Sequence, residues 1–103
     1  MEALQQSAFR DGLTGLYNRK FLEEHTKKLI PQALRDKFNI GVLLLDMDHF
    51  KAVNDEYGHD IGDKVLKELA RILNETIRES DIIIRYGGEE FIVLLVNIKT
   101  EEQ

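Results

Sequence analysis

Cysteine is absent from the 103-residue sequence, so disulfides, cysteinyl zinc sites and thiol nucleophiles are all excluded. No hydrophobic run approaches the roughly 18–20 residues that a membrane-spanning helix needs, and the amino terminus lacks a signal-peptide pattern. Acidic residues outnumber basic ones by 19 to 14, and the net charge of −5 gives no electrostatic basis for binding nucleic acid or an anionic membrane. We therefore expect a cytoplasmic protein with neither of these partners.

The composition that is present is ordinary for a globular protein, with 43% hydrophobic and 32% charged residues. A chain of 103 residues forms one domain or less. Internal repeats, low-complexity tracts and flexible linkers are not found. Helical and strand patterns alternate along the chain, which predicts an α/β or α+β sandwich.

The first third of the chain predicts a short helix, a turn and a longer helix. Residues 1–9 favour helix and resemble the end of a helix that begins upstream. Residues 11–19 contain two glycines and an asparagine, which is typical of a turn. Asn18 is a suitable N-cap for an amphipathic helix that follows, and Pro31 is expected to kink or end that helix.

A second turn and a second amphipathic helix are predicted near the middle of the chain. Gly58 and Gly62 are expected to bracket the turn, after which Asp60 or Asp63 starts the helix. Apolar residues recur at helical spacing over residues 61–77. One face of this helix is therefore expected to pack on a sheet.

Three apolar runs predict strands. Residues 40–45 are almost continuously apolar, as in a strand that is covered on both faces. Residues 82–86 and 91–96 are rich in β-forming side chains, and two glycines lie between them. These two runs predict a β-hairpin with a tight turn.

Four carboxylates lie at the ends of these strands. Asp46 and Asp48 would share one face if the strand extends that far, whereas the adjacent Glu89 and Glu90 would point to opposite faces. The glycines before Glu89 leave room for a ligand to approach the backbone. Such a group is typical of a site for Mg²⁺ with substrate phosphates. The alternative is a set of ordinary strand-end and turn residues.

Other known motifs are not matched. The segment from Asp46 does not fit the EF-hand template, and neither a Walker A nor an HExxH sequence is present. His25, His49 and His59 lack the spacing of metal ligands. A hydrophobic strand followed by acidic residues also fits the phospho-acceptor pocket of receiver domains, but nothing in that fold calls for the GGEEF hairpin.

The string RYGGEEF at residues 85–91 resembles the signature of the GGDEF family, the diguanylate cyclases, in its GGEEF form. DGLTGLYNR at residues 11–19, DMDHFKAVND at 46–55 and GHDIGD at 58–63 resemble the other family segments in order and spacing. The resemblance implies a nucleotidyl-cyclase-like palm, in which helices flank a mixed sheet with the GGEEF hairpin.

The same resemblance divides the chain into two parts. Residues 1–10 would be the end of an upstream linker helix, and residues 11–103 a partial GGDEF domain that lacks about a third at its C-terminal side. An upstream sensor domain is the implied partner of the linker. Asp11 and Arg19 of the DGLTGLYNR segment could pair with each other.

The activity that the resemblance implies is the condensation of two GTP molecules into cyclic di-GMP with release of pyrophosphate. Each 3′-hydroxyl attacks the other α-phosphate, so the enzyme works as a homodimer with Mg²⁺ or Mn²⁺ as the cofactor. Asp46, Glu89 and the backbone carbonyl of Met47 would be metal ligands. Glu90 would be a further ligand or the general base, and Asp48 a second ligand or a support for the loop.

Five further residues match substrate-binding positions of the family. Lys51 would contact a terminal phosphate, and Gly87 and Gly88 would allow close approach of the nucleotide. Asn54 and Asp63 match guanine-contacting positions, which suits guanine because its N1–H and N2–H₂ groups are donors. From the residues alone, a turn is the favoured interpretation of Asn54 and a helix start that of Asp63, and only the resemblance reverses this preference.

Arg78 and Asp81 form an RxxD pair that resembles the inhibitory site at which the family binds cyclic di-GMP. The alternative is structural, because Arg78 is expected in the last turn of a helix, where a cation is favoured, and Asp81 in the loop after it.

A non-catalytic module that binds GTP or cyclic di-GMP is the second functional hypothesis, because the last third of the domain is missing. Without that part, the strand at residues 40–45 would be an open apolar edge. We expect self-association through this edge or its exposed face, with exchange of strands between copies as one form of it.

Overall fold

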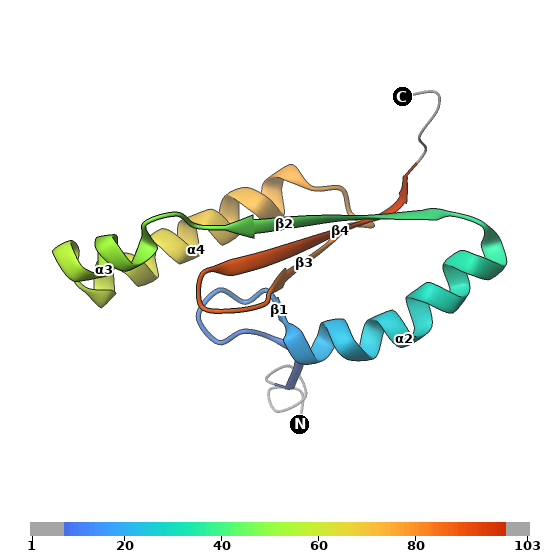
Figure 1. Cartoon of the computed structure of the whole chain (residues 1–103), viewed down its shortest axis with the longest axis horizontal. Helices are drawn as coiled ribbons and strands as arrows, with labels where there is room; N and C mark the ends of the chain where they lie inside the picture. The colour runs from blue at the N-terminus through green and yellow to red at the C-terminus, as the bar shows by residue number, and fades with distance from the viewer. Residues whose placement is uncertain (1–7, 99–103) are drawn as a thin grey trace.

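The computed structural model describes residues 8–98 (Figure 1). Residues 1–7 of the expected linker helix lie outside this described part. In chain order the elements are β1 (Tyr17–Asn18), α2 (Arg19–Asp36), β2 (Asn39–Asp46), α3 (Phe50–Tyr57), α4 (His59–Thr76), β3 (Ile82–Arg85) and β4 (Glu90–Ile98).

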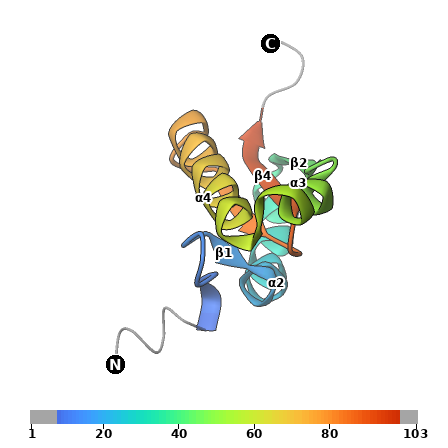
Figure 2. The same cartoon turned by 90° about the vertical axis from the view of Figure 1, so that its left-hand side faces the viewer.

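The four strands form one mixed sheet in the order β1-β3-β4-β2. β4 pairs antiparallel with both β2 and β3, while β1 pairs parallel with β3. α2 and α4 lie on opposite sides of this sheet (Figures 1 and 2). The predicted sandwich with a hairpin of residues 82–86 and 91–96 is therefore confirmed.

The core follows from the alternation of side chains along the two central strands. Ile83 and Val93 point to the side of α4, where they belong to the same cluster as the buried Leu66. Ile84 and Leu94 point to the other side and pack with Leu29 of α2. Each helix thus covers one face of the β3–β4 hairpin and fixes its orientation.

The ends of α2 explain its length. The Asn18 side chain accepts a hydrogen bond from the Phe21 amide at 2.9 Å, which confirms the predicted N-cap. Pro31 does not end the helix, which continues to Asp36. It stops at Lys37, whose φ of 59° is left-handed and whose amide donates to the Ala33 carbonyl.

The region between the strand and the second long helix differs from the prediction. The sequence did not predict α3, and α4 begins at His59, so Asp60 lies in its first turn and Asp63 does not start it. Gly58, with a φ of 92°, forms the turn between the two helices. Gly62 lies inside α4, where it is buried.

β2 is an edge strand in the described part of the chain, bonded to β4 on one side. Val42, Leu43 and Leu44 are 58%, 48% and 76% exposed. The prediction that this strand is covered on both faces is therefore wrong for the described residues, whereas the expected apolar edge is present. No helix within residues 8–98 is long and apolar enough to cross a membrane.

Candidate functional site

Asp46 and Glu90 are paired directly across the antiparallel ladder of β2 and β4. Directly opposed residues project to the same face of a sheet, so the two carboxylates share one face. Just beyond them, the Met47 amide donates to the Glu89 carbonyl at 3.2 Å. The end of β2 is therefore fastened to the residues that follow the glycine pair.

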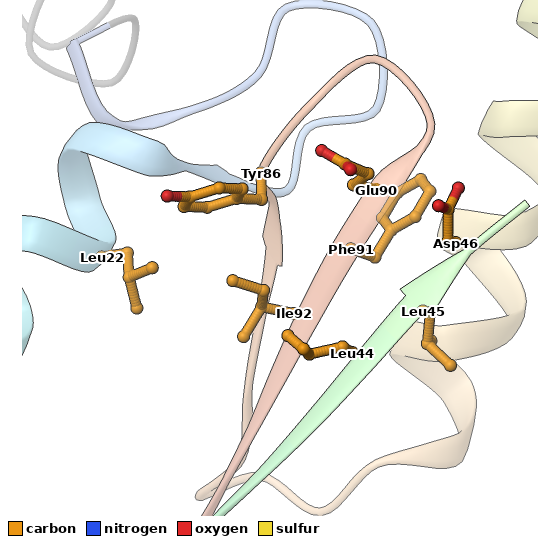
Figure 3. A pocket seen from close by; sticks show the side chains of 8 residues that line it. All are labelled: Leu22, Leu44, Leu45, Asp46, Tyr86, Glu90, Phe91 and Ile92. Atoms are coloured by element: carbon orange, nitrogen blue, oxygen red, sulfur yellow. The ribbon is translucent and has the colours of Figure 1, made fainter.

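Both carboxylates line a pocket of about 560 Å³ between α2 and the strands (Figure 3). Its walls are mostly apolar and come from Leu22, Leu44, Leu45, Tyr86, Phe91 and Ile92. In Figure 3 the carboxylates of Asp46 and Glu90 lie at one end, away from Leu22 and Leu44. The arrangement joins an apolar recess to a pair of anionic oxygen donors.

The other two carboxylates are not part of this pocket. Glu89 lies in the turn and is absent from the residues that line the recess, as expected for the neighbour of Glu90. Asp48 follows the end of β2 at Asp46, so the strand does not extend far enough to align the two aspartates. Within residues 8–98, no group of three or more acidic or histidine side chains is close enough to hold a metal ion.

The donor set that does form is compatible with a hard cation. Mg²⁺ commonly binds one or two carboxylates and completes its shell with water and substrate phosphates. Asp46 and Glu90 supply two carboxylates from opposed strands, and both side chains are exposed to solvent. These residues therefore fit the partial protein shell that such an ion uses.

The two glycines of the hairpin have different surroundings. A Cβ at Gly87 would overlap the Glu90 carboxylate, so this position makes room for a side chain of the protein itself. A Cβ at Gly88 would have no neighbour within 4 Å. Of the two predicted points of close approach, Gly88 is the one that lies open.

Asn54 and Asp63 are brought near each other by the crossing of α3 and α4. The Asn54 Oδ1 atom occupies the space in which Gly62 would carry a Cβ, and Gly62 immediately precedes Asp63. Asn54 is half-buried and Asp63 is exposed. Lys51, also on α3, extends into solvent and pairs with Asp55 at 3.1 Å.

Arg78 and Asp81 form a tight ion pair. The Asp81 side chain is 2% exposed and accepts bonds from the Arg78 amide, from the Arg78 guanidinium at 2.7 Å and from the Val96 amide. The hydrogen bonds from Arg78 hold the pKa of Asp81 below its ordinary value, although burial acts in the opposite direction. Arg78 lies beyond the end of α4 at Thr76, so its predicted place in the last helical turn is wrong.

A second ion pair links the DGLTGLYNR segment to the hairpin. Arg85 pairs with Asp11 at 3.0 Å, and its Nη2 and Nε atoms donate to the Gly88 carbonyl at 2.7 and 3.2 Å. Burial would raise the pKa of Asp11, but hydrogen bonds from Thr14 and Arg85 outweigh it and lower this pKa. The pairing of Asp11 with Arg19 that the sequence suggested is not formed.

Arg19 contacts the hairpin instead. Its guanidinium lies 4.1 Å from the centre of the Tyr86 ring, and Nη2 donates to the Tyr86 carbonyl at 3.3 Å. Arg85, Tyr86 and these contacts were not predicted from the sequence as part of the site. Arg85 and Tyr86 could have been considered, because both immediately precede the glycine pair.

The profile described as "Diguanylate cyclase, GGDEF domain" matches residues 8–103. The chain is 46% identical over 95 residues to diguanylate cyclase DgcP of Pseudomonas aeruginosa, which covers 92% of this chain and 14% of that protein. It is 50% identical over 93 residues to the uncharacterized protein YhcK of Bacillus subtilis, covering 89% of this chain and 26% of YhcK. The chain therefore spans a minor part of these relatives.

Solved structures agree with this match. Diguanylate cyclase SiaD of Pseudomonas aeruginosa, in complex with its activator SiaC, superposes with a TM-score of 0.87 at 42% identity. That match covers 98% of this chain and 39% of SiaD. A second match is the coiled coil and GGDEF domain of DgcB from Caulobacter crescentus in complex with c-di-GMP, with a TM-score of 0.90 at 31% identity. It covers 96% of this chain and 52% of that DgcB chain.

The signature string, the mixed sheet with its hairpin, the sequence relatives and the superposed structures all agree. The chain belongs to the GGDEF family of diguanylate cyclase domains.

Proposed function

We propose that this chain forms the GTP-binding and metal-binding part of a diguanylate cyclase, which converts two GTP molecules into cyclic di-GMP and two pyrophosphates. The observation that carries the proposal is the direct opposition of Asp46 and Glu90 at the rim of a pocket, beside the GGEE turn. Membership in the GGDEF family supplies the reaction class.

Asp46, Glu89, Glu90 and the Met47 carbonyl are the residues that would hold Mg²⁺ or Mn²⁺. A bound divalent cation would stabilise negative charge on phosphate oxygens during the displacement. One of the two glutamates accepts the proton of the attacking 3′-hydroxyl, because a carboxylate within reach of that group can act as its general base. Glu90 is the better placed of the two toward the pocket, which it lines.

Substrate recognition would come from α3, α4 and the turn. Asn54 and Asp63 contact guanine, whose N1–H and N2–H₂ groups match carboxylate and amide oxygens. Lys51 provides a mobile positive charge for a terminal phosphate and would exchange its exposed partner Asp55 for that phosphate. Gly88 allows the nucleotide to approach the backbone, since nothing lies where its side chain would be.

Product control would use Arg78. Its guanidinium is half-exposed while Asp81 is buried, so Arg78 would contact cyclic di-GMP and Asp81 would orient it. The expected result for Arg78→Ala is a weaker affinity for cyclic di-GMP in calorimetry. An unchanged affinity would remove the inhibitory site from the proposal.

Catalysis requires two copies, because each copy presents one GTP and the two nucleotides must meet. We propose a homodimer in the parent protein, under the control of an upstream sensor domain. Association of the isolated chain through β2, with or without exchange of strands, is a separate proposal that rests on the exposure of Val42, Leu43 and Leu44. A monomer at tens of micromolar in light scattering would contradict it.

A non-catalytic module that binds GTP or cyclic di-GMP is the second candidate. One observation favours it, namely that the described residues 8–98 do not gather three metal-ligating side chains at one point. Binding of nucleotide without turnover would identify this function.

The deciding experiment is chromatography of the products after the chain is incubated with GTP and Mg²⁺. Glu89→Gln and Glu90→Gln are compared with Glu23→Gln, which makes the same change at an exposed site on α2. Cyclic di-GMP from the wild type and Glu23→Gln, but not from the other two, is the expected result. If none of the proteins gives product while the wild type binds GTP, the second candidate is correct.

A further inference from the structure

The turn that carries Glu89 is held by Arg85 through the backbone. Two nitrogens of the Arg85 guanidinium donate to the Gly88 carbonyl, at 2.7 and 3.2 Å. The Gly88 carbonyl and the Glu89 amide belong to one planar peptide unit. Arg85 therefore fixes the orientation of the plane from which the Glu89 side chain starts.

Without Arg85, the Gly88–Glu89 peptide unit would be held only through its neighbours. Gly87 and Gly88 have no side chains, and glycine backbones are the most costly to order. The Tyr86 and Gly87 amides both donate to the Glu90 carbonyl, which closes the turn, and the Met47 amide donates to the Glu89 carbonyl at 3.2 Å. These bonds hold the peptides on either side but do not reach the Gly88–Glu89 peptide unit itself. The Gly88 side of the turn is also open, since no atom lies within 4 Å of its absent Cβ.

Asp11 fixes Arg85 in turn. Both Asp11 oxygens accept from Arg85 Nη1, at 3.0 and 3.1 Å. Asp11 is itself held by the Thr14 amide and hydroxyl, both at 2.8 Å. The side chains of Arg85 and Asp11 are only 16% and 21% exposed, so this pair is far less screened by water than the surface pairs of the helices.

From these contacts we propose that Arg85 is a positioning residue for the proposed metal-binding turn, and that Asp11 orients Arg85. Arg85 does not touch the reacting atoms but acts through Gly88 on Glu89. This inference rests on the proposed function for its catalytic meaning, whereas the ordering of the turn can be measured independently. Arg19 adds a weaker and more exposed contact at Tyr86.

The test compares Arg85→Lys and Asp11→Asn with Arg71→Lys in the 103-residue chain. Lysine keeps the charge of Arg85 but cannot reach Asp11 and Gly88 at once. Arg71 is the matched control because it also binds two partners, Glu68 and Glu75, but on the exposed side of α4. Asp11→Asn keeps the shape of the side chain, and it provides the test if Arg85→Lys does not fold.

The first readout is the ¹⁵N order parameter of the turn, without metal or nucleotide. We expect the order parameters of Gly88 and Glu89 to fall from about 0.85 in the wild type to below about 0.6 in Arg85→Lys and Asp11→Asn. Ile84 and Val93 in the core should keep their values, and Arg71→Lys should match the wild type. Unchanged order in the turn of both variants would overturn the inference.

The second readout is the affinity for Mn²⁺, followed by paramagnetic broadening. Loss of a residue that orients a metal ligand typically weakens binding by about 10- to 100-fold, and we expect this loss in both variants but not in Arg71→Lys. If the wild type binds no Mn²⁺, the proposed function fails while the order parameters still decide the role of Arg85. If the turn loosens but Mn²⁺ affinity is unchanged, the positioning role is wrong and the contact is merely structural.

Discussion

Asp46 and Glu90 stand directly opposite each other across β2 and β4, with no basic residue among those lining the pocket they share. Like charges at directly opposed positions of an antiparallel pair destabilise it. The site is therefore expected to reduce the stability of the fold when no cation is bound.

The first prediction follows from this opposition. Glu90→Gln should raise the free energy of unfolding by up to about 1 kcal/mol in metal-free buffer, because it removes one of the two charges. Mn²⁺ should raise the melting temperature of the wild type but not of the variant. Glu23→Gln is the control, and equal stability of all three proteins in chelator would contradict the prediction.

The second prediction concerns the crossing of α3 and α4. Gly62→Ala should destabilise the chain by up to about 2 kcal/mol, because the new methyl group displaces the Asn54 side chain and this cost exceeds the roughly 1 kcal/mol by which alanine is favoured over glycine inside a helix. Gly12→Ala is the matched control, since nothing lies within 4 Å of a Cβ there and its φ is not positive. Urea titration would measure the stability of both variants, and equal unfolding midpoints would exclude the overlap.

Acid sensitivity provides the third prediction. Because the pKa of Asp81 is lowered in the fold, its pairing stabilises the folded state fully above the ordinary carboxyl pKa and is lost as the pH falls through the lowered value. Asp81→Asn should cost about 1–3 kcal/mol at pH 7 and progressively less below about pH 4. Melting temperatures of the wild type and Asp81→Asn between pH 7 and pH 3 would measure this loss of stability. Asp36→Asn is the control, because the Asp36 side chain is exposed.

A fourth prediction tests the end of α2. Lys37 has a φ of 59°, and the amides of Lys37 and Phe38 both donate to the Ala33 carbonyl, as in a left-handed helix cap. Lys37→Gly should stabilise the chain by up to about 1 kcal/mol, since glycine adopts this conformation without a steric penalty. Lys28→Gly, inside the same helix, should destabilise it by a similar amount. A loss of stability in Lys37→Gly would contradict the assignment.

Local signals in the sequence were sufficient for much of the fold. The Asn18 cap, the hairpin around Gly87 and Gly88, and the amphipathic α4 each depend on residues close together in the chain. α3 was not predicted, because it has only eight residues and a single buried one, Phe50, and so shows little hydrophobic periodicity. β1, with two residues, is likewise too short to give a strand pattern.

The site was harder to predict, because its contacts are distant in sequence. The residues Asp46 and Glu90 could be selected from their types and positions, but their opposition depends on the register of β2 against β4. The Asp11–Arg85 pair spans 74 positions and depends on β1 lying beside β3. Neither the register nor the strand order follows from local preferences.

The parallel pairing of β1 with β3 has a consequence for the way in which the molecule opens. Within residues 8–98, backbone pairing joins the segment before α2 to the sheet only at Tyr17 and Asn18, opposite Ile84 and Arg85, whereas the β2–β4 ladder runs the length of β2. Segments held by few backbone bonds exchange their amide hydrogens through low-energy local unfolding. Residues 10–15, which precede the buried Leu16, should therefore open more readily than the β2–β4–β3 sheet, so that the Asp11–Arg85 contact behind the GGEE turn breaks and re-forms without unfolding of the domain.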